Sequence, residues 1–142
     1  MQTEAILLVD DNAVQAAIRQ TILRRQGYLV ITALNPARAL EQLRQGDFLT
    51  EIRLIITDHV MPNMSGTRFV RGVRQILPEI PVLVISGMEA EDEYEGLNVV
   101  FRLKPLQPES LLDCVRGLIC RPLVTERSEV EASAALPPLP AR

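Results

Sequence analysis

A short apolar run ends in two adjacent carboxylates in the stretch AILLVDDN, residues 5–12. Such a run, bounded by polar residues, is typical of a strand that is buried on both faces, as in a parallel sheet. From residue 12 to residue 26, apolar or small side chains recur at helical spacing, with Asp11 or Asn12 as a cap and Gly27 as a stop. The segment therefore predicts the first strand–helix unit of an α/β domain.

One face of this first predicted helix carries its apolar and small side chains. We expect that face to be buried against the sheet, which leaves Gln15 and Arg19 outside for contact with a partner. The side chains predicted to be buried are Val14, Ala17, Ile18, Thr21 and Ile22.

The same alternation of strand and helix continues along the chain. Further apolar or β-branched runs at residues 28–33, 54–57, 82–86 and 99–103 predict four more strands. Helical periodicity predicts helices over residues 36–45, before Pro78 and over residues 108–120. Alternating strands and helices require a parallel sheet with helices on both faces and right-handed crossovers. Because only 4% of the residues are aromatic, the core must be aliphatic.

Two segments depart from this pattern. Residues 87–98, GMEAEDEYEGLN, are acidic and lack clear apolar periodicity. Residues 122–142 are rich in small residues and proline, with no second apolar core in view. We therefore expect one domain over residues 1–121, followed by a flexible C-terminal tail.

The bulk composition excludes several classes of function. A net charge of −3 gives no field that attracts a polyanion, so we expect no direct nucleic-acid binding. Cys114 and Cys120 lie on different faces of the last predicted helix, so reduced thiols are expected rather than a disulfide. The N-terminus has no basic leader and no apolar run is long enough to span a membrane, so we expect a cytoplasmic protein.

Polar side chains follow four of the five predicted strands at their carboxyl ends, where open α/β sheets bind ligands. They are Asp10 and Asp11, Asp58, Ser86, and Lys104. Clustered carboxylates repel one another unless a cation neutralises them, and carboxylate ligands with an open side suit Mg²⁺. A single aspartate at a strand end is often only a helix cap. The joint placement of all five residues instead predicts a phosphoryl-transfer site with an aspartate as acceptor.

Four motifs in order, ILLVDDN, LIITDHVMPNMSG, PVLVISG and FRLKP, resemble the receiver domain of two-component response regulators. The resemblance spans roughly residues 4–121. It implies a flavodoxin-like, doubly wound sheet of five parallel strands in the order 2-1-3-4-5.

The resemblance also implies a role for each site residue. Asp58 would be the phosphoacceptor, Lys104 would pair with the phosphoryl oxygens, and Ser86 would turn inward to them, followed by the switch aromatic Phe101. Mg²⁺ would be bound by Asp11, Asp58 and the backbone carbonyl of Val60, with Asp10 acting through water. His59, beside the acceptor, is expected only to line the loop, because nothing in the sequence supplies an orienting partner.

Two features of the chain differ from the resemblance. Ser86 and Lys104 are 18 positions apart, about one helical turn closer than is usual. We therefore expect a shortened fourth helix within residues 87–98, and a mobile segment there that orders on phosphorylation. Val60 and Met88, which flank the acceptor, are both apolar and cannot orient water, so slow loss of the phosphoryl group is expected.

These observations favour a single-domain response regulator rather than a turnover enzyme. Its expected partners are a histidine kinase or histidine phosphotransfer protein and an unknown downstream protein; a weak or phosphorylation-dependent dimer is compatible with the sequence. One alternative is a receiver fold used as a phosphorylation-independent interaction module. A second is an Mg²⁺-dependent aspartyl-phosphate phosphohydrolase, although VDDNA lacks the Asp-x-Asp spacing of the haloacid dehalogenase type.

Overall fold

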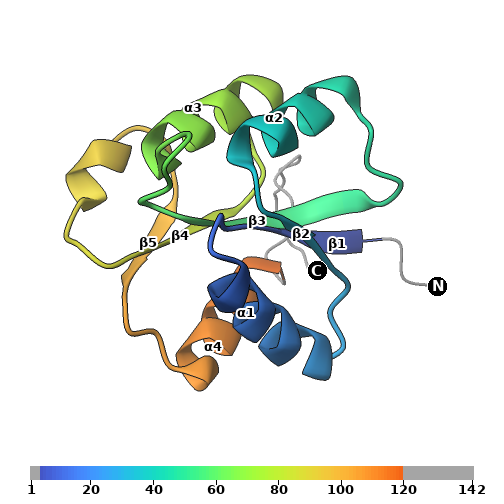
Figure 1. Ribbon diagram of the computed structural model, residues 1–142, viewed down its shortest axis with the longest axis vertical. Coiled ribbons are helices and arrows are strands. Elements are labelled where there is room, and N and C mark those ends of the chain that lie inside the picture. Colours follow the sequence, from blue (N-terminus) through green and yellow to red (C-terminus); the bar gives the residue numbers. More distant parts are fainter. Residues whose placement is uncertain (1–3, 120–142) are drawn as a thin grey trace, which may run out of the picture.

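A parallel sheet of five strands forms the centre of the molecule, with helices α2 and α3 on one face and α1 and α4 on the other (Figure 1). The computed structural model describes residues 4–119. The strand order is β2-β1-β3-β4-β5, as expected. The strands are β1 Glu4–Val9, β2 Val30–Ala33, β3 Glu51–Asp58, β4 Val82–Ser86 and β5 Val100–Leu103. The helices are α1 Ala13–Arg25, α2 Pro36–Gln45, α3 Gly66–Ile76, the 3₁₀ helix η1 Glu91–Tyr94, and α4 Pro108–Ile119.

The ends of β3 differ most from the prediction over residues 54–57. Its first three residues alternate in polarity, with Glu51 exposed and the next two partly buried, so they lack the apolar signal of a central strand. Glu51 and Ile52 nevertheless pair with Glu4 and Ala5 of β1, and Arg53 lies at the register shift that follows. Arg53 Nη1 donates to Glu4 Oε2 at 2.9 Å across the same two strands. A cross-strand ion pair thus extends the ladder where the hydrophobic pattern stops.

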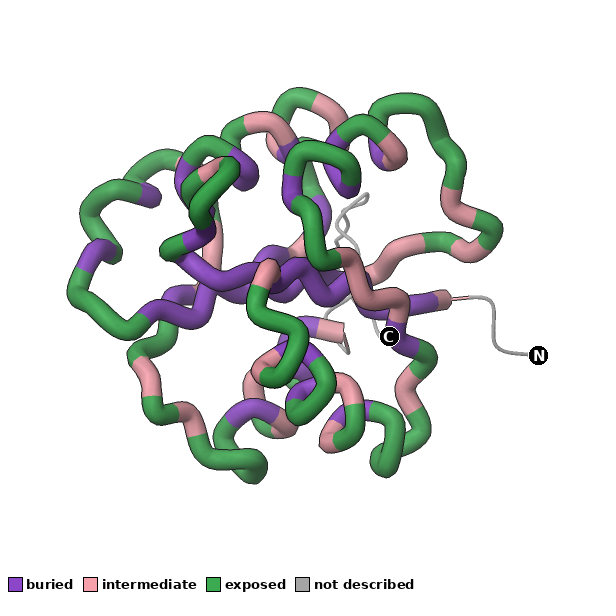
Figure 2. The backbone as a smooth tube through the Cα atoms, viewed as in Figure 1, coloured by how far each residue is buried: buried purple, intermediate pink, exposed green. Residues whose placement is uncertain are grey.

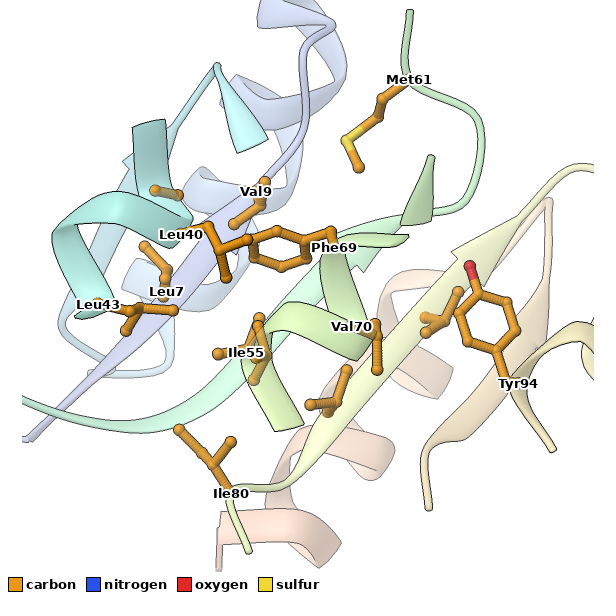
Figure 3. Packing of buried hydrophobic residues seen from close by; sticks show 14 of the residues in the cluster. Leu7, Val9, Leu40, Leu43, Ile55, Met61, Phe69, Val70, Ile80 and Tyr94 are labelled. Atoms are coloured by element: carbon orange, nitrogen blue, oxygen red, sulfur yellow. The ribbon is translucent and has the colours of Figure 1, made fainter. Parts of the chain in front are cut away.

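The core consists of two aliphatic layers, one on each face of the sheet. Successive strand residues point to opposite faces, so Leu7 and Val9 pack under α2 and α3 while Ile6 and Leu8 pack against α1 and α4. Figure 3 shows the first layer, where Phe69 of α3 lies beside the strands. Burial is concentrated along the central strands (Figure 2). The aliphatic core predicted from the composition is confirmed.

The predicted buried face of α1 is wrong except for Ile22, which is partly buried against the core. Val14 is 70% exposed and Ile18 is 56% exposed. The helix instead buries Ala16, Arg19 and Leu23. Both sets have helical spacing, so periodicity alone does not distinguish them. The apolar set Ala13, Val14, Ala17, Ile18, Thr21 and Ile22 forms an open surface, here called the α1 apolar face.

Residues 87–98 contain the short 3₁₀ helix η1 in place of a full fourth helix. The spacing of Ser86 and Lys104 predicts this shortening. Two buried side chains hold the turn to the domain, with Ala90 2% exposed and Tyr94 3% exposed. Gly96 and Asn98 both have positive φ and lead the chain into β5. Ordering of this segment on phosphorylation stays a prediction.

The predicted tail, residues 122–142, and Cys120 lie outside the described residues. Cys114 is a free thiol at the half-buried inner side of α4. Within residues 4–119, no helix has the length and apolar character needed to cross a membrane.

Candidate functional site

The carboxyl ends of β1, β3, β4 and β5 place four polar side chains at one edge of the sheet. Asp58 ends β3 and pairs in register with Ile85, one residue before Ser86 at the end of β4. Ser86 pairs in turn with Leu103, one residue before Lys104. Asp10 follows Val9, the last residue of β1. The parallel register therefore brings together residues that are far apart in the sequence, as the strand pattern predicts.

Asp58 and Lys104 form the central ion pair of this edge. Asp58 is 5% exposed. The Lys104 ammonium Nζ lies 3.0 Å from Asp58 Oδ1. This contact is electrostatic rather than a well-directed hydrogen bond, and Oδ1 accepts no hydrogen bond from any described residue. A buried carboxylate oxygen with unused acceptor capacity, beside a fixed cation, is suited to binding a further electrophile or cation.

Asp10 is fully buried and is held by three donors. Its Oδ1 accepts the Asn12 N–H at 2.9 Å. Its Oδ2 accepts Gln15 Nε2 and Arg19 Nη1, both at 3.0 Å. Burial raises the pKa of the Asp10 carboxyl above its usual range, and the negative charge of Asp58 acts in the same direction. The Asn12 N–H and the cationic Arg19 and Lys104 lower that pKa and offset part of the rise.

The predicted magnesium ligands are only partly gathered. Asp11 is partly exposed at the turn before α1, and the Val60 side chain is 62% exposed. Among residues 4–119, no three His, Cys, Asp or Glu side chains are close enough together to form a ready metal cluster. The donor chemistry nonetheless fits a hard divalent cation, because the carboxylates and backbone carbonyls here are oxygen ligands and Asp58 Oδ1 is buried without a hydrogen bond.

Ser86 and Phe101 both lie inside the fold. The Ser86 hydroxyl donates to the Met88 carbonyl at 2.6 Å and accepts the Met88 N–H at 3.0 Å. These two bonds close a small turn after β4 and engage the hydroxyl within that turn. Phe101 is 8% exposed and packs against Tyr94, with 5.8 Å between the ring centroids. Met88 is 52% exposed at the rim.

His59 has the orienting partner that the sequence did not reveal. It is buried, and its Nδ1 lies 2.7 Å from the Tyr94 hydroxyl of η1. The two rings also meet edge to face, with 5.6 Å between centroids. Glu93 Oε1 lies 3.8 Å from His59 Nε2. The one sequence signal was that Tyr94 is the sole aromatic residue in an otherwise acidic segment. This contact ties η1 to the residue that follows Asp58.

The ionisation of Tyr94 gives a direct test of this contact. Burial raises its pKa to about 12, and the nearby negative charges of Glu93 and Asp58 add to the rise. In a Tyr28→Phe chain, where Tyr94 is the sole tyrosine, phenolate absorbance should therefore rise with a midpoint near pH 12. The pKa of Tyr94 is higher in the folded chain than in the unfolded chain, so the neutral phenol contributes to stability below pH 10. This contribution is lost as the pH rises from 10 to about 12. A folded chain that titrates near pH 10, as in concentrated urea, would contradict the buried placement.

Gly66 begins α3 at a point with no room for a side chain. A Cβ atom there would lie 2.5 Å from the Tyr94 hydroxyl and 2.6 Å from the Asp58 carbonyl oxygen. We expect Gly66→Ala to lower the free energy of unfolding by about 1–3 kcal/mol, because backbone and buried rings must shift. Urea denaturation measures this loss. Gly117→Ala is the matched control, since a Cβ atom at that position of α4 would have nothing within 4 Å and alanine favours a helix. Equal stability of the two variants would contradict the close packing.

Comparison with known proteins agrees with this architecture. The sequence profile of the family described as response regulator receiver domain matches residues 6–116. The hydrogenase transcriptional regulatory protein HoxA of Cupriavidus necator is 37% identical over 120 residues, which cover 80% of this chain and 24% of HoxA. The two-component response regulator ORR6 of Oryza sativa subsp. japonica is 35% identical over 113 residues, covering 75% of this chain and 65% of ORR6.

Solved structures show the same fold. The chemotaxis protein CheY4 of Vibrio cholerae superposes with a TM-score of 0.72 at 26% identity, covering 83% of this chain and 99% of that one. A CheY-like receiver domain protein of Methanospirillum hungatei has a TM-score of 0.75 at 20% identity, covering 83% and 94%. The chain thus matches nearly the whole of these receiver structures but less than two thirds of the length of HoxA and ORR6.

Proposed function

The chain belongs to the response regulator receiver domain family of two-component systems, and we propose on that basis that it accepts a phosphoryl group on Asp58. The phosphodonor is a histidine kinase or a histidine phosphotransfer protein in the cytoplasm. The output is contact with a downstream protein or onward transfer of the phosphoryl group. Residues 1–121 act as the receiver unit in this proposal.

The observation that carries the proposal is the ion pair between Lys104 and Asp58 at the carboxyl edge of the sheet, 3.0 Å long. An Asp58 carboxylate oxygen attacks the phosphorus of a phosphohistidine, forming an acyl phosphate O–P bond as the N–P bond breaks. The released imidazole nitrogen keeps the bonding pair and takes up a proton. The Lys104 ammonium stays beside the oxygens on which negative charge collects.

We propose that Asp11, Asp58 and the Val60 carbonyl hold Mg²⁺, with Asp10 acting through water. When bound, the cation neutralises charge on the phosphoryl oxygens and on the carboxylates. The chain would contribute the oxygen ligands for this purpose, and the Lys104 ammonium lies beside Asp58.

Ser86 and Phe101 are the proposed switch. To bond a phosphoryl oxygen, the Ser86 hydroxyl must give up its two bonds to the Met88 backbone. That exchange frees the turn after β4, which leads directly into η1 and the Tyr94–Phe101 ring contact. A charge added at Asp58 is thereby coupled to the surface formed by η1 and β5.

The α1 apolar face is the proposed docking surface for the phosphodonor, in place of the Gln15 and Arg19 surface expected from the sequence. It is apolar, it is open, and it lies on the helix that follows Asp10 and Asp11. An amphipathic helix of the donor can bury Val14 and Ile18 against its own apolar side chains.

An Ile18→Asp chain tests this docking surface. Ile18 is 56% exposed, so we expect unfolding free energy to change by less than about 0.5 kcal/mol. Phosphotransfer from a phosphotransfer protein that labels the wild type should fall at least about tenfold, because burying a charge opposes docking. Labelling by acetyl phosphate, which needs no docking, should be unchanged. Leu49→Asp is the matched control, an exposed leucine away from α1. Equal transfer to both variants would contradict docking here.

One experiment tests the proposed function against its two alternatives. The wild-type chain is incubated with acetyl phosphate and Mg²⁺, and bound and released phosphate are both measured. One stable phosphoryl group per chain supports the receiver. Continuous phosphate release without a stable adduct supports a phosphohydrolase, and no reaction supports a phosphorylation-independent interaction module.

A further inference from the structure

The inner face of α1 carries a buried arginine toward the proposed metal site. The Arg19 side chain is 11% exposed, and its Nη1 lies 3.0 Å from Asp10 Oδ2. Its second nitrogen, Nη2, donates to Gln15 Oε1 at 3.4 Å, and Gln15 donates back to the same Asp10 oxygen. A buried arginine is costly unless it is paired, so this contact requires Asp10 to remain charged and in place.

The hydrogen bonds that Asp10 accepts leave its carboxylate few free acceptor positions for further ligands. Oδ2 already accepts two hydrogen bonds, and Oδ1 accepts one from Asn12. Arg19 balances the charge of the carboxylate from within the protein. The remaining acceptor position on Oδ1 is the one able to receive a water molecule.

We propose that Arg19 is a positioning residue that sets the strength of divalent-cation binding in this receiver. Its guanidinium fixes Asp10 and balances its charge, so the site binds Mg²⁺ more weakly than the carboxylates would without it. The Arg19–Asp10 ion pair also balances the negative charge of the buried Asp10 when no metal is bound. The inference rests on the proposed function only in placing Mg²⁺ beside Asp10, Asp11 and Asp58.

The test is binding of Mg²⁺ alone, measured by titration calorimetry on the full chain without any phosphodonor. We expect Arg19→Gln to bind Mg²⁺ about five- to tenfold more tightly than the wild type, because a positive charge near the site is removed. Arg25→Gln removes the same charge from an exposed position on the same helix and should stay within about twofold. Arg19→Lys keeps the charge and should also stay near the wild-type affinity.

An Arg19→Gln affinity equal to that of Arg25→Gln, or weaker than the wild type, overturns the inference. If Arg19→Gln does not fold, nitrogen-15 spectra of the wild-type Arg19 guanidinium decide instead. We expect restricted rotation with and without saturating Mg²⁺, whereas free rotation in the loaded protein overturns the inference. Absence of Mg²⁺ binding by the wild type removes both this inference and the proposed metal site. Tight binding that Arg19 does not affect removes this inference alone.

Discussion

An Asp58→Asn chain is expected to acquire no phosphoryl group from acetyl phosphate in the presence of Mg²⁺. The amide keeps the shape of the side chain but lacks the anionic oxygen that attacks phosphorus. The change also removes the negative partner of Lys104, whose Nζ lies 3.0 Å from Asp58 Oδ1. Intact-mass measurement compares the variant with the wild type, which should carry one phosphoryl group.

Asp47→Asn is the matched control, because Asp47 is an exposed carboxylate beyond the end of α2. It should be phosphorylated like the wild type. Labelling of Asp58→Asn to the wild-type extent would place the acceptor on another carboxylate and contradict the assignment. The variant also has one negative charge fewer near Asp10, which removes one of the causes that raise the pKa of the Asp10 carboxyl.

Lys104→Met removes the cation of the ion pair with Asp58. We expect phosphorylation by acetyl phosphate to slow at least about tenfold, because the cation beside the reacting oxygens is lost. The free energy of unfolding at pH 7 without metal should fall by about 2 kcal/mol, since the buried Asp58 carboxylate loses its paired charge. Intact mass, measured after the phosphorylation reaction is quenched at successive times, gives the rate of phosphorylation. Urea denaturation gives the free energy of unfolding.

Lys104→Arg separates charge from geometry in the same experiments. It keeps the positive charge, so its stability should remain closer to that of the wild type, while its planar head does not reproduce the position of Nζ. If Lys104→Met is phosphorylated at the wild-type rate, the ion pair is structural and Lys104 does not assist phosphoryl transfer.

The strand–helix alternation was predictable because it depends on local patterns alone. Parallel strands buried on both faces are read as continuous apolar runs, and the residues that follow such runs must meet at one edge. The positions of Asp10, Asp58, Ser86 and Lys104 at that edge therefore follow from the sequence. The polar start of β3 does not follow from the sequence in this way. Its contact with β1 includes an ion pair between Arg53 and Glu4, which lie far apart in the sequence.

The orientation of α1 was not predictable from periodicity. Hydrophobicity alone favours burial of Val14 and Ile18, but the structure buries Arg19, which pairs with Asp10. This ion pair joins α1 to the residue that follows β1, a contact that a count of apolar positions omits. Because Arg19 faces the core, the α1 apolar face lies on the outer side of the helix.

The contact between His59 and Tyr94 was missed for a related reason. Their separation of 35 residues is bridged only when α3 and β4 are folded between them. A short η1 brings Tyr94 to His59, and Gly66 leaves just enough room for the Tyr94 hydroxyl. The shortened segment was predictable from the spacing of Ser86 and Lys104, but the side chain that anchors it was not.

Direct mapping of the modified residue tests the assignment of Asp58 as the phosphoacceptor. The phosphorylated chain is reduced with borohydride, which converts an aspartyl phosphate to homoserine, and is then digested and sequenced by mass spectrometry. Our account predicts homoserine at position 58 and at no other aspartate. Homoserine at Asp10 or Asp11, or a stable phosphoryl group that leaves Asp58 unreduced, would contradict it.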